Sequence, residues 1–187
     1  MPRKKQYNEQ EVIEKAMQLF WRNGYETTSV QMLEKEMGIN KFSIYASFGS
    51  KDGVFLESIK CYEKQLNVLI KELKNDSNGV QSIKEYFREF LLFSKGNRSG
   101  KGCLITNTAN EIGQDANVKI KMVLKDFMKR VRTVFATVLA KDKSKDGKTI
   151  EQQADFLIIS MFGLSSASRV FNPEQMENYI ENIFRNI

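Results

Sequence analysis

Histidine is absent from this chain of 187 residues, which also contains only two cysteines, two prolines and one tryptophan. Without histidine the chain cannot assemble Ser-His-Asp or Cys-His nucleophiles, HExxH zinc sites or Cys/His zinc fingers. Cys61 and Cys103 are too few for a four-cysteine metal site, and they suit a reducing compartment. Neither a GxxxxGK[ST] phosphate loop nor a GxGxxG motif occurs. We therefore expect no cofactor and no metal.

Long apolar runs are also missing, since no stretch reaches the roughly eighteen residues that a membrane-spanning helix needs. The basic N-terminus, MPRKKQYNEQ, is not followed by the apolar segment of a signal peptide. We therefore expect a cytoplasmic protein with no membrane partner. The formal net charge of +6 permits nucleic-acid binding without proving it. Residues 101–150 carry 11 Lys+Arg against 5 Asp+Glu, whereas residues 1–51 carry 8 against 6.

Almost every segment that remains is predicted to be helical, because proline occurs only at positions 2 and 173 and alternating β-branched residues are scarce. The first helix is expected from about Glu9 to Asn23, where Gly24 ends it. Its buried face has the spacing of one side of a helix and consists of Val12, Ile13, Ala16, Leu19 and Phe20.

Two short helices separated by a turn follow, which is the pattern of a helix-turn-helix. The first is expected to begin at Thr28, a natural N-cap that would form a capping box with Gln31. It should run to about Met37 and stop at Gly38, after which Asn40 caps the next helix.

The second helix of this pair exposes an unusual set of side chains. Ile39 and Ile44 can anchor it to the helix before it, which leaves an outer side of Lys41, Phe42, Ser43 and Ser47. In a helix-turn-helix this outer side enters the major groove of DNA, where each base pair presents its own donors and acceptors.

The stretch GYETTSVQMLEKEMGINKFSIYASFGSKDGVF resembles the DNA-binding domain of the TetR family of transcriptional repressors. The match covers residues 9 to about 56, and its combination of GYxxTSV, GINK and SIYxxFxSK is specific. One departure is Phe42, where many members carry a small residue or proline, and its ring should alter which bases are tolerated. The segment GKGCLITNTANEIG is similar to a GCLxxNxAxE segment in one regulatory subgroup of the same family.

The resemblance implies an all-α fold of about nine helices, with a helix-turn-helix DNA-binding domain in residues 1–51. Residues 52–187 would form a larger ligand-binding and dimerisation domain. The implied function is that of a ligand-responsive repressor rather than an enzyme. It would bind a palindromic operator on double-stranded DNA as a homodimer and be released by a small, largely apolar effector.

The chemistry of the side chains suggests how DNA would be contacted. Lys41 can donate to guanine, and Phe42 offers an apolar contact to a base. Hydroxyls and ammonium groups suit phosphates, and the start of the preceding helix favours an anion. The predicted DNA contacts are Thr28, Gln31, Lys41, Phe42, Ser43, Tyr45, Ser47 and Lys51. An N-terminal arm of Arg3, Lys4 and Lys5 could add affinity by counterion release, or be a solvated tail.

The rest of the chain is expected to form a bundle whose helices cover residues 51–74, 80–95, a segment opening near 102–103, 118–141, 149–170 and 173–186. Its many Phe, Met, Leu and Ile residues would ordinarily be plain core, but the resemblance implies a ligand cavity between the helices. The candidate ligand-binding residues are Phe90, Phe93, Cys103, Asn107, Glu111 and Phe127. Asn107, Asn110 and Glu111 would orient the ligand if they face inward, and they would otherwise form a solvent-facing stripe.

Cys103 supports an alternative trigger, a thiol that senses oxidants or electrophiles. It should lie in the first turn of a helix, near Lys101, where thiolate is favoured. It could equally be a small buried residue that helps the helix begin, and this interpretation is preferred.

The last two helices are the predicted dimer interface, because Gly163 and the serines after it would let a partner helix approach closely. The apolar residues assigned to this interface are Leu157, Met161, Leu164, Met176, Ile180, Ile183 and Phe184. Two other classes of function stay open from the residues alone, a small carboxylate-based enzyme and a helical adaptor that binds only protein. A gel-shift assay with the upstream DNA separates these classes from a repressor.

Overall fold

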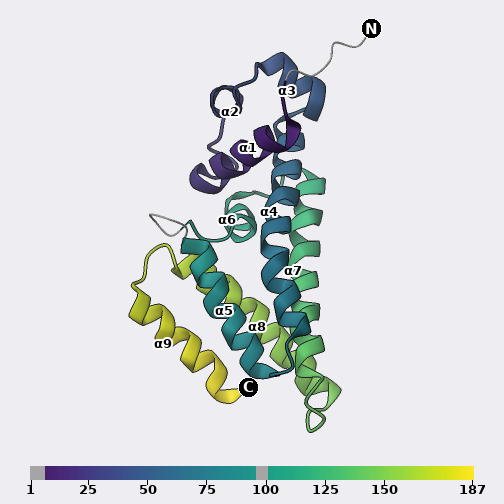
Figure 1. The fold of residues 1–187 in the computed structure, drawn as a ribbon, viewed down its shortest axis with the longest axis vertical. Coiled ribbons are helices and arrows are strands. Elements are labelled where there is room, and N and C mark those ends of the chain that lie inside the picture. The colour runs from purple at the N-terminus through teal and green to yellow at the C-terminus, as the bar shows by residue number, and fades with distance from the viewer. Residues whose placement is uncertain (1–6, 96–100) are drawn as a thin grey trace.

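The computed structural model describes residues 7–95 and 101–187, and these residues form nine α-helices and one short 3-10 helix (Figure 1). The all-α class predicted from the sequence is therefore confirmed for the described residues. The arm of Arg3, Lys4 and Lys5 lies outside them.

The N-terminal helices are α1 (Glu9–Asn23), α2 (Val30–Met37) and α3 (Lys41–Phe48). The predicted bounds of α1 are confirmed, and Gly24 and Gly38 end α1 and α2 with positive φ angles of 92° and 69°. Asn40 caps α3 as predicted, because its side chain accepts a hydrogen bond of 2.8 Å from the amide of Ser43.

The predicted cap of α2 is wrong by one residue. Ser29, not Thr28, is the N-cap, and its hydroxyl accepts a hydrogen bond from the amide of Met32 at 3.2 Å. Thr28 is fully buried and donates its hydroxyl to the carbonyl of Gly24 at 2.6 Å. Thr28 and Ser29 both carry a hydroxyl that could cap α2. Because the Thr28 side chain is buried and bonded to Gly24, Ser29 is the cap.

The remaining helices are α4 (Lys51–Asn75), α5 (Val80–Lys95), α6 (Leu104–Glu111), α7 (Val118–Leu139), α8 (Gly147–Ala167) and α9 (Pro173–Ile183). The prediction for 80–95 is confirmed at both ends. Helix α8 begins at Gly147 rather than at 149, because the Asp146 side chain accepts a hydrogen bond from the amide of Thr149 at 2.7 Å.

Helix α4 contacts both the N-terminal helices and the helices that follow it (Figure 1). Helix α1 packs against α4, while α5 and α7 pack on α4 further along, and α8 packs on α7. The short α6 contacts α1, α4, α7 and α8. The predicted boundary between residues 51 and 52 falls inside the first turn of α4, so no loop separates the two parts.

Aromatic rings join α1 to the helices behind it. The ring of Trp21 lies 5.0 Å from that of Tyr62 on α4 and 5.3 Å from that of Phe93 on α5, measured between centroids. The indole Nε1 donates to the carbonyl of Gly102 at 2.8 Å. Ring pairs of this kind contribute about 0.5–1.5 kcal/mol beyond the area they bury. The only tryptophan therefore lies where the N-terminal helices meet the rest of the chain.

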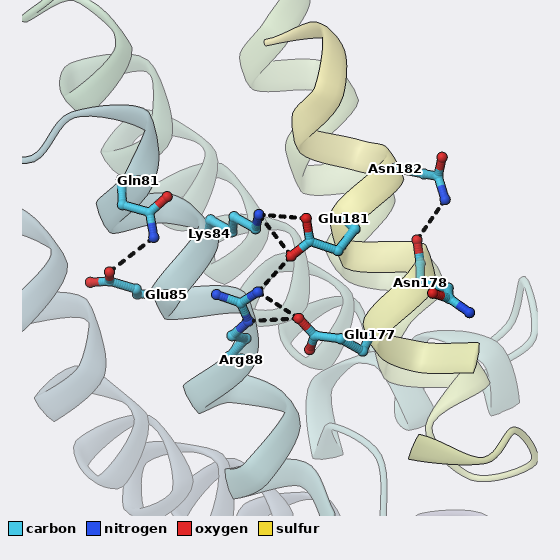
Figure 2. Close-up of polar contacts among 8 residues, drawn as sticks. All are labelled: Gln81, Lys84, Glu85, Arg88, Glu177, Asn178, Glu181 and Asn182. Atoms are coloured by element: carbon cyan, nitrogen blue, oxygen red, sulfur yellow. Dashed lines mark hydrogen bonds and ion pairs between the residues drawn. The ribbon is translucent and has the colours of Figure 1, made fainter. Parts of the chain in front are cut away.

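Helix α9 is held against α5 by ion pairs, which Figure 2 shows. Lys84 lies 2.8 Å from the Glu181 carboxylate, and Arg88 contacts Glu177 at 2.5 Å and Glu181 at 2.6 Å. The hydrogen bond to Lys84 is the largest cause that lowers the pKa of Glu181 below its ordinary value.

None of the helices in the described ranges is both long and apolar enough to cross a lipid bilayer.

Candidate functional site

Helix α3 presents a surface that no other part of the described chain covers. The side chain of Phe42 is 81% exposed, which is unusual for a phenylalanine, and Lys41 and Tyr45 lie exposed beside it. The ammonium of Lys41 lies 5.6 Å from the centroid of the Tyr45 ring. Ile44 is buried and Phe48 packs partly on the core, so these two side chains anchor α3 while Lys41, Phe42 and Tyr45 stay exposed.

Tyr7 fixes α3 from its outer end, and sequence reasoning missed this residue. Its hydroxyl lies 2.7 Å from the Ser47 hydroxyl and donates to the carbonyl of Ser43 at 3.4 Å. Ser43 and Ser47 are both half-buried. Ser47 was predicted to contact DNA, but its hydroxyl already has a partner inside the protein. A tyrosine two residues before the start of α1 gave no sequence signal for this long-range contact.

Thr28 and Gln31, the two DNA contacts predicted at the start of α2, differ in their exposure. Gln31 is exposed in the first turn of α2, whereas the Thr28 side chain is buried and its hydroxyl is bonded to Gly24. The Thr28 side chain therefore cannot reach DNA in this conformation, and its contribution is to hold the turn between α1 and α2.

Lys51 is half-buried rather than free at the surface. Its ammonium lies 4.5 Å from the centroid of the Tyr25 ring and donates to the Glu26 carbonyl at 3.3 Å. Burial is the largest influence on this ammonium and lowers the pKa of Lys51, against the nearby carboxylates, which raise it. A phosphate contact from Lys51 would have to replace contacts that it already makes.

The residues predicted to bind a ligand have other contacts in the described part of the chain. Phe90 and Phe127 are buried core residues, and Phe93 packs on Trp21. Asn107 is buried and donates to the Lys101 carbonyl at 2.7 Å, so it supports the loop before α6.

Glu111 was a candidate ligand contact if it faced the interior, and it does not face the interior. It is exposed and directed at the turn between α1 and α2, where it accepts a hydrogen bond from the Tyr25 amide at 2.7 Å. Asn110 is also exposed. The sequence could not show this, because the partner lies 86 residues away along the chain.

Cys103 is the N-cap residue of α6 and is fully buried. Burial is the largest influence on the thiol and raises its pKa, although the Tyr62 hydroxyl and the amides of Ile105 and Thr106 lower it. The thiolate predicted from the helix position is therefore not favoured. Lys101 does not assist, because its ammonium lies over the Trp21 ring, 5.0 Å from the centroid.

Two tyrosine hydroxyls close to Cys103 were missed by sequence reasoning. Tyr62 on α4 and Tyr86 on α5 are completely enclosed, and the Tyr86 hydroxyl makes no hydrogen bond within the described residues, whereas the Tyr62 hydroxyl lies beside the Cys103 thiol. Both rings and the Cys103 thiol are buried, and the Tyr62 hydroxyl lowers the pKa of that thiol. A buried hydroxyl without a partner costs about 1–3 kcal/mol, so this region would gain from a molecule that supplies an acceptor.

A cleft of about 780 Å³ opens between α1, α3, α4 and α7. Its apolar lining includes Ile13, Phe48 and Met122, and Lys60 and Glu57 form an ion pair at its edge. None of the predicted ligand-binding residues lines this cleft.

The residues predicted to supply the apolar area of the dimer interface instead pack within their own chain. Leu157, Met161, Leu164, Met176, Ile180 and Ile183 are all buried, and Phe184 packs on Phe87. A second apolar surface, formed by α8, α9 and the turn between them, is exposed instead. It consists of Phe156, Ile159, Val170, Phe171 and Tyr179, with Gly163 in a shallow apolar pocket between α8 and α9.

Comparison with known proteins gives three kinds of similarity. The family model described as "Bacterial regulatory proteins, tetR family" matches residues 12–58, which include α2, α3 and the start of α4. An uncharacterized HTH-type transcriptional regulator, YezE of Bacillus subtilis (strain 168), is 31% identical over 112 residues, or 59% of this chain and 58% of that protein. The match thus spans less than two thirds of that relative.

A longer match connects the chain with IcaR of Staphylococcus aureus (strain Newman), a negative transcriptional regulator of the biofilm operon icaADBC. It is 24% identical over 149 residues, covering 79% of this chain and 77% of IcaR. Among solved structures, a cysteine mutant of the TetR family regulator CifR in complex with 26-base-pair operator DNA has a TM-score of 0.87. It is 24% identical and covers 98% of both chains. The reduced form of Escherichia coli NemR has a TM-score of 0.81 at 19% identity, covering 95% of this chain and 94% of NemR.

The contact between Tyr7 and Ser47 predicts a measurable coupling. Tyr7→Phe and Ser47→Ala should each lower the free energy of unfolding by about 0.5–1.5 kcal/mol, because each removes the same hydrogen bond. The double variant should then be less destabilised than the sum of the two, as measured in a double-mutant cycle by urea denaturation. Tyr45→Phe is the matched control, since it removes an exposed hydroxyl from the same helix. Additive losses would show that the two hydroxyls do not interact.

Proposed function

Because the chain is a transcriptional regulator of the TetR family with a DNA-binding helix-turn-helix, we propose that it is a repressor released from its operator by a small molecule. The observation that carries this proposal is the outer surface of α3. An 81% exposed Phe42 next to Lys41 has no packing role in the protein, and it suits the major groove, where a lysine can donate to guanine.

Several features support repression at an operator. The IcaR relative is described as a negative regulator, and CifR is a similar fold seen with operator DNA. One α3 can read only a few base pairs, so a two-fold dimer on a palindromic site fits the geometry. Repression follows where such a dimer occupies a promoter.

The proposed dimer interface is the exposed apolar face of α8 and α9. Phe156, Ile159 and Gly163 follow each other at helical spacing along α8, and Tyr179 of α9 stands beside Gly163, where its hydroxyl would lie 3.0 Å from an added Cβ. A contiguous exposed apolar face of this kind marks an association surface. Because the ion pairs of Figure 2 hold α9 in place, the two helices can present it as one rigid unit.

The proposed effector site lies between α4, α5 and α6, around the Tyr62 and Tyr86 hydroxyls and not around Glu111. The surrounding side chains are aromatic and apolar, which favours a small, largely apolar molecule. The Tyr86 hydroxyl, which has no hydrogen-bond partner among the described residues, favours one that also carries a hydrogen-bond acceptor. Such a molecule would have to displace α6 or α5 to enter, and release of DNA would follow from that displacement.

The second candidate is a repressor triggered through the Cys103 thiol. The observation in its favour is that Cys103 lies beside the Tyr62 hydroxyl and the first amides of α6, all of which stabilise a thiolate. Its burial opposes this, because burial raises the pKa of the thiol more than these groups lower it.

The exposed side of α3 gives a prediction about the DNA sequence that the protein prefers. Lys41→Ala and Phe42→Ala should each reduce the discrimination between operator and scrambled DNA by about 1–3 kcal/mol, because each removes a base contact. The measurement is fluorescence anisotropy with an operator selected from random DNA and a scrambled duplex of equal length. Lys35→Ala, also exposed on the neighbouring helix, is the control. If Lys41→Ala weakened both duplexes equally, Lys41 would be a phosphate contact.

The corrected dimer face gives a second prediction. Ile159→Glu should convert the dimer to monomers at micromolar concentration, because a charge would be buried in an apolar interface. Sedimentation velocity measures this, and Val68→Glu on α4 is the control because Val68 is similarly exposed, at 55% against 69% for Ile159. A parent chain that sediments as a monomer, or an Ile159→Glu variant that stays dimeric, would contradict the assigned interface.

Substitution of Cys103 separates the two triggers. If the effector acts in the interior, Cys103→Ser should still bind operator and still be released by the small molecules that release the parent. If the thiol is the trigger, the variant should stay bound under all of them. The measurement is anisotropy during titration with a panel of apolar and electrophilic compounds, and Cys61→Ser controls for the second thiol.

A further inference from the structure

Glu111, the last residue of α6, reaches across to the turn between α1 and α2. One of its oxygens, Oε2, accepts hydrogen bonds from the amides of Tyr25 at 2.7 Å and Glu26 at 3.2 Å. Gly24 lies against the same carboxylate, since an added Cβ there would be 2.9 Å from Oε2. Glycine therefore allows both the φ of 92° and the close approach of the carboxylate at this turn.

The Tyr25 side chain ties the same turn to two further helices. Its hydroxyl donates to Oδ1 of Asp52, in the first turn of α4, at 2.6 Å. Asn117, the N-cap of α7, donates from Nδ2 to the other Asp52 oxygen at 2.6 Å. Burial and the bond to Asp52 raise the pKa of Tyr25 above its ordinary range, so the phenol keeps its proton and remains the donor.

We propose that Glu111 is a positioning residue for DNA recognition, which holds the turn between α1 and α2, and with it the helix-turn-helix, at one angle to α6. This inference rests on the proposed function and adds to it a route from the effector region to the DNA-reading helices. Residues 104–108 of α6 are buried beside the effector region. At the C-terminal end of α6, Glu111 accepts a hydrogen bond from the Tyr25 amide in the turn between α1 and α2. A shift of α6 therefore moves or breaks the contact with the turn.

The negative charge of Glu111 makes the inference testable by the sign of the change in DNA affinity. A carboxylate near a DNA-binding surface repels phosphate, so its removal should by charge alone strengthen binding to every duplex. Loss of a positioning contact should instead weaken binding to the operator, which needs one orientation of α3, and leave non-specific binding almost unchanged. The two effects have opposite signs.

The experiment compares Glu111→Ala with Asp115→Ala, which removes the same charge from an exposed position in the next loop. Binding is measured by anisotropy on an operator selected from random DNA and on a scrambled duplex. Relative to Asp115→Ala, we expect Glu111→Ala to bind operator about tenfold more weakly, within the usual range of coupling between sites, and scrambled DNA within about twofold. Glu111→Gln retains a carbonyl acceptor and should stay within about threefold of the parent on operator.

Amide hydrogen exchange tests the anchoring without DNA. The Tyr25 amide should exchange at least about tenfold faster in Glu111→Ala than in Asp115→Ala, because it loses its acceptor. The inference is overturned if that amide is equally protected in both variants. It is also overturned if Glu111→Ala binds operator as tightly as Asp115→Ala, or loses operator and scrambled DNA in equal proportion, which would indicate unfolding.

These outcomes keep the two proposals distinguishable. A parent chain that prefers no DNA sequence overturns the proposed function and the role of Glu111 in recognition, whatever the exchange result. A parent that binds an operator while Glu111→Ala behaves like Asp115→Ala leaves the proposed function standing and overturns only the role of Glu111.

Discussion

The arrangement depends on α4 being one uninterrupted helix that belongs to both parts of the chain. It runs over 25 residues, which corresponds to about 37 Å of helix. The N-terminal helices pack against its first turns, and α5 and α7 pack along the rest (Figure 1). Because an α-helix cannot bend sharply without losing backbone hydrogen bonds, displacement at one end is passed on as a tilt of the whole helix. The orientation of α3 is therefore set by whatever fixes α4 and by the contacts around it.

Two kinds of contact fix that orientation, and they differ in how they respond to displacement. The aromatic contacts of Trp21 with Tyr62 and Phe93 are broad and tolerate small sliding. The hydrogen bonds of Glu111 and Tyr25 are directional and are lost over a fraction of an ångström to a few ångströms. The aromatic contacts thus keep the two parts together, while the polar contacts select one angle between them.

Much of the fold could be predicted from the sequence, because its signals are local. Gly24, Gly38 and Asn40 mark helix ends by backbone conformation and capping, and the structure confirms all three. The cap of α2 was misassigned because Thr28 and Ser29 offer the same chemistry, and only burial, a tertiary property, separates them.

The functional surfaces were harder to predict, for two physical reasons. Helix α8 carries apolar residues on two faces, such as Leu157 inside and Ile159 outside, and periodicity alone cannot say which face meets the core. Glu111 was read as a ligand contact because its partners, the amides of Tyr25 and Glu26, have no signature in the sequence. The hydroxyls of Tyr62 and Tyr86 were overlooked for the same reason, since their complete burial depends on other helices.

The energies involved are consistent with control by a small molecule. Coupling between an effector site and a binding site is typically 1–3 kcal/mol, and an effector can supply no more than its difference in affinity for the two conformations. Hydrogen bonds to a charged group such as the Glu111 carboxylate contribute about 1.5–3 kcal/mol each. Loss of one of its two bonds to backbone amides is therefore of the size needed, without any unfolding of the core. The helices can remain intact while the angle between α3 and the rest of the chain changes, which is what a reversible switch on DNA requires.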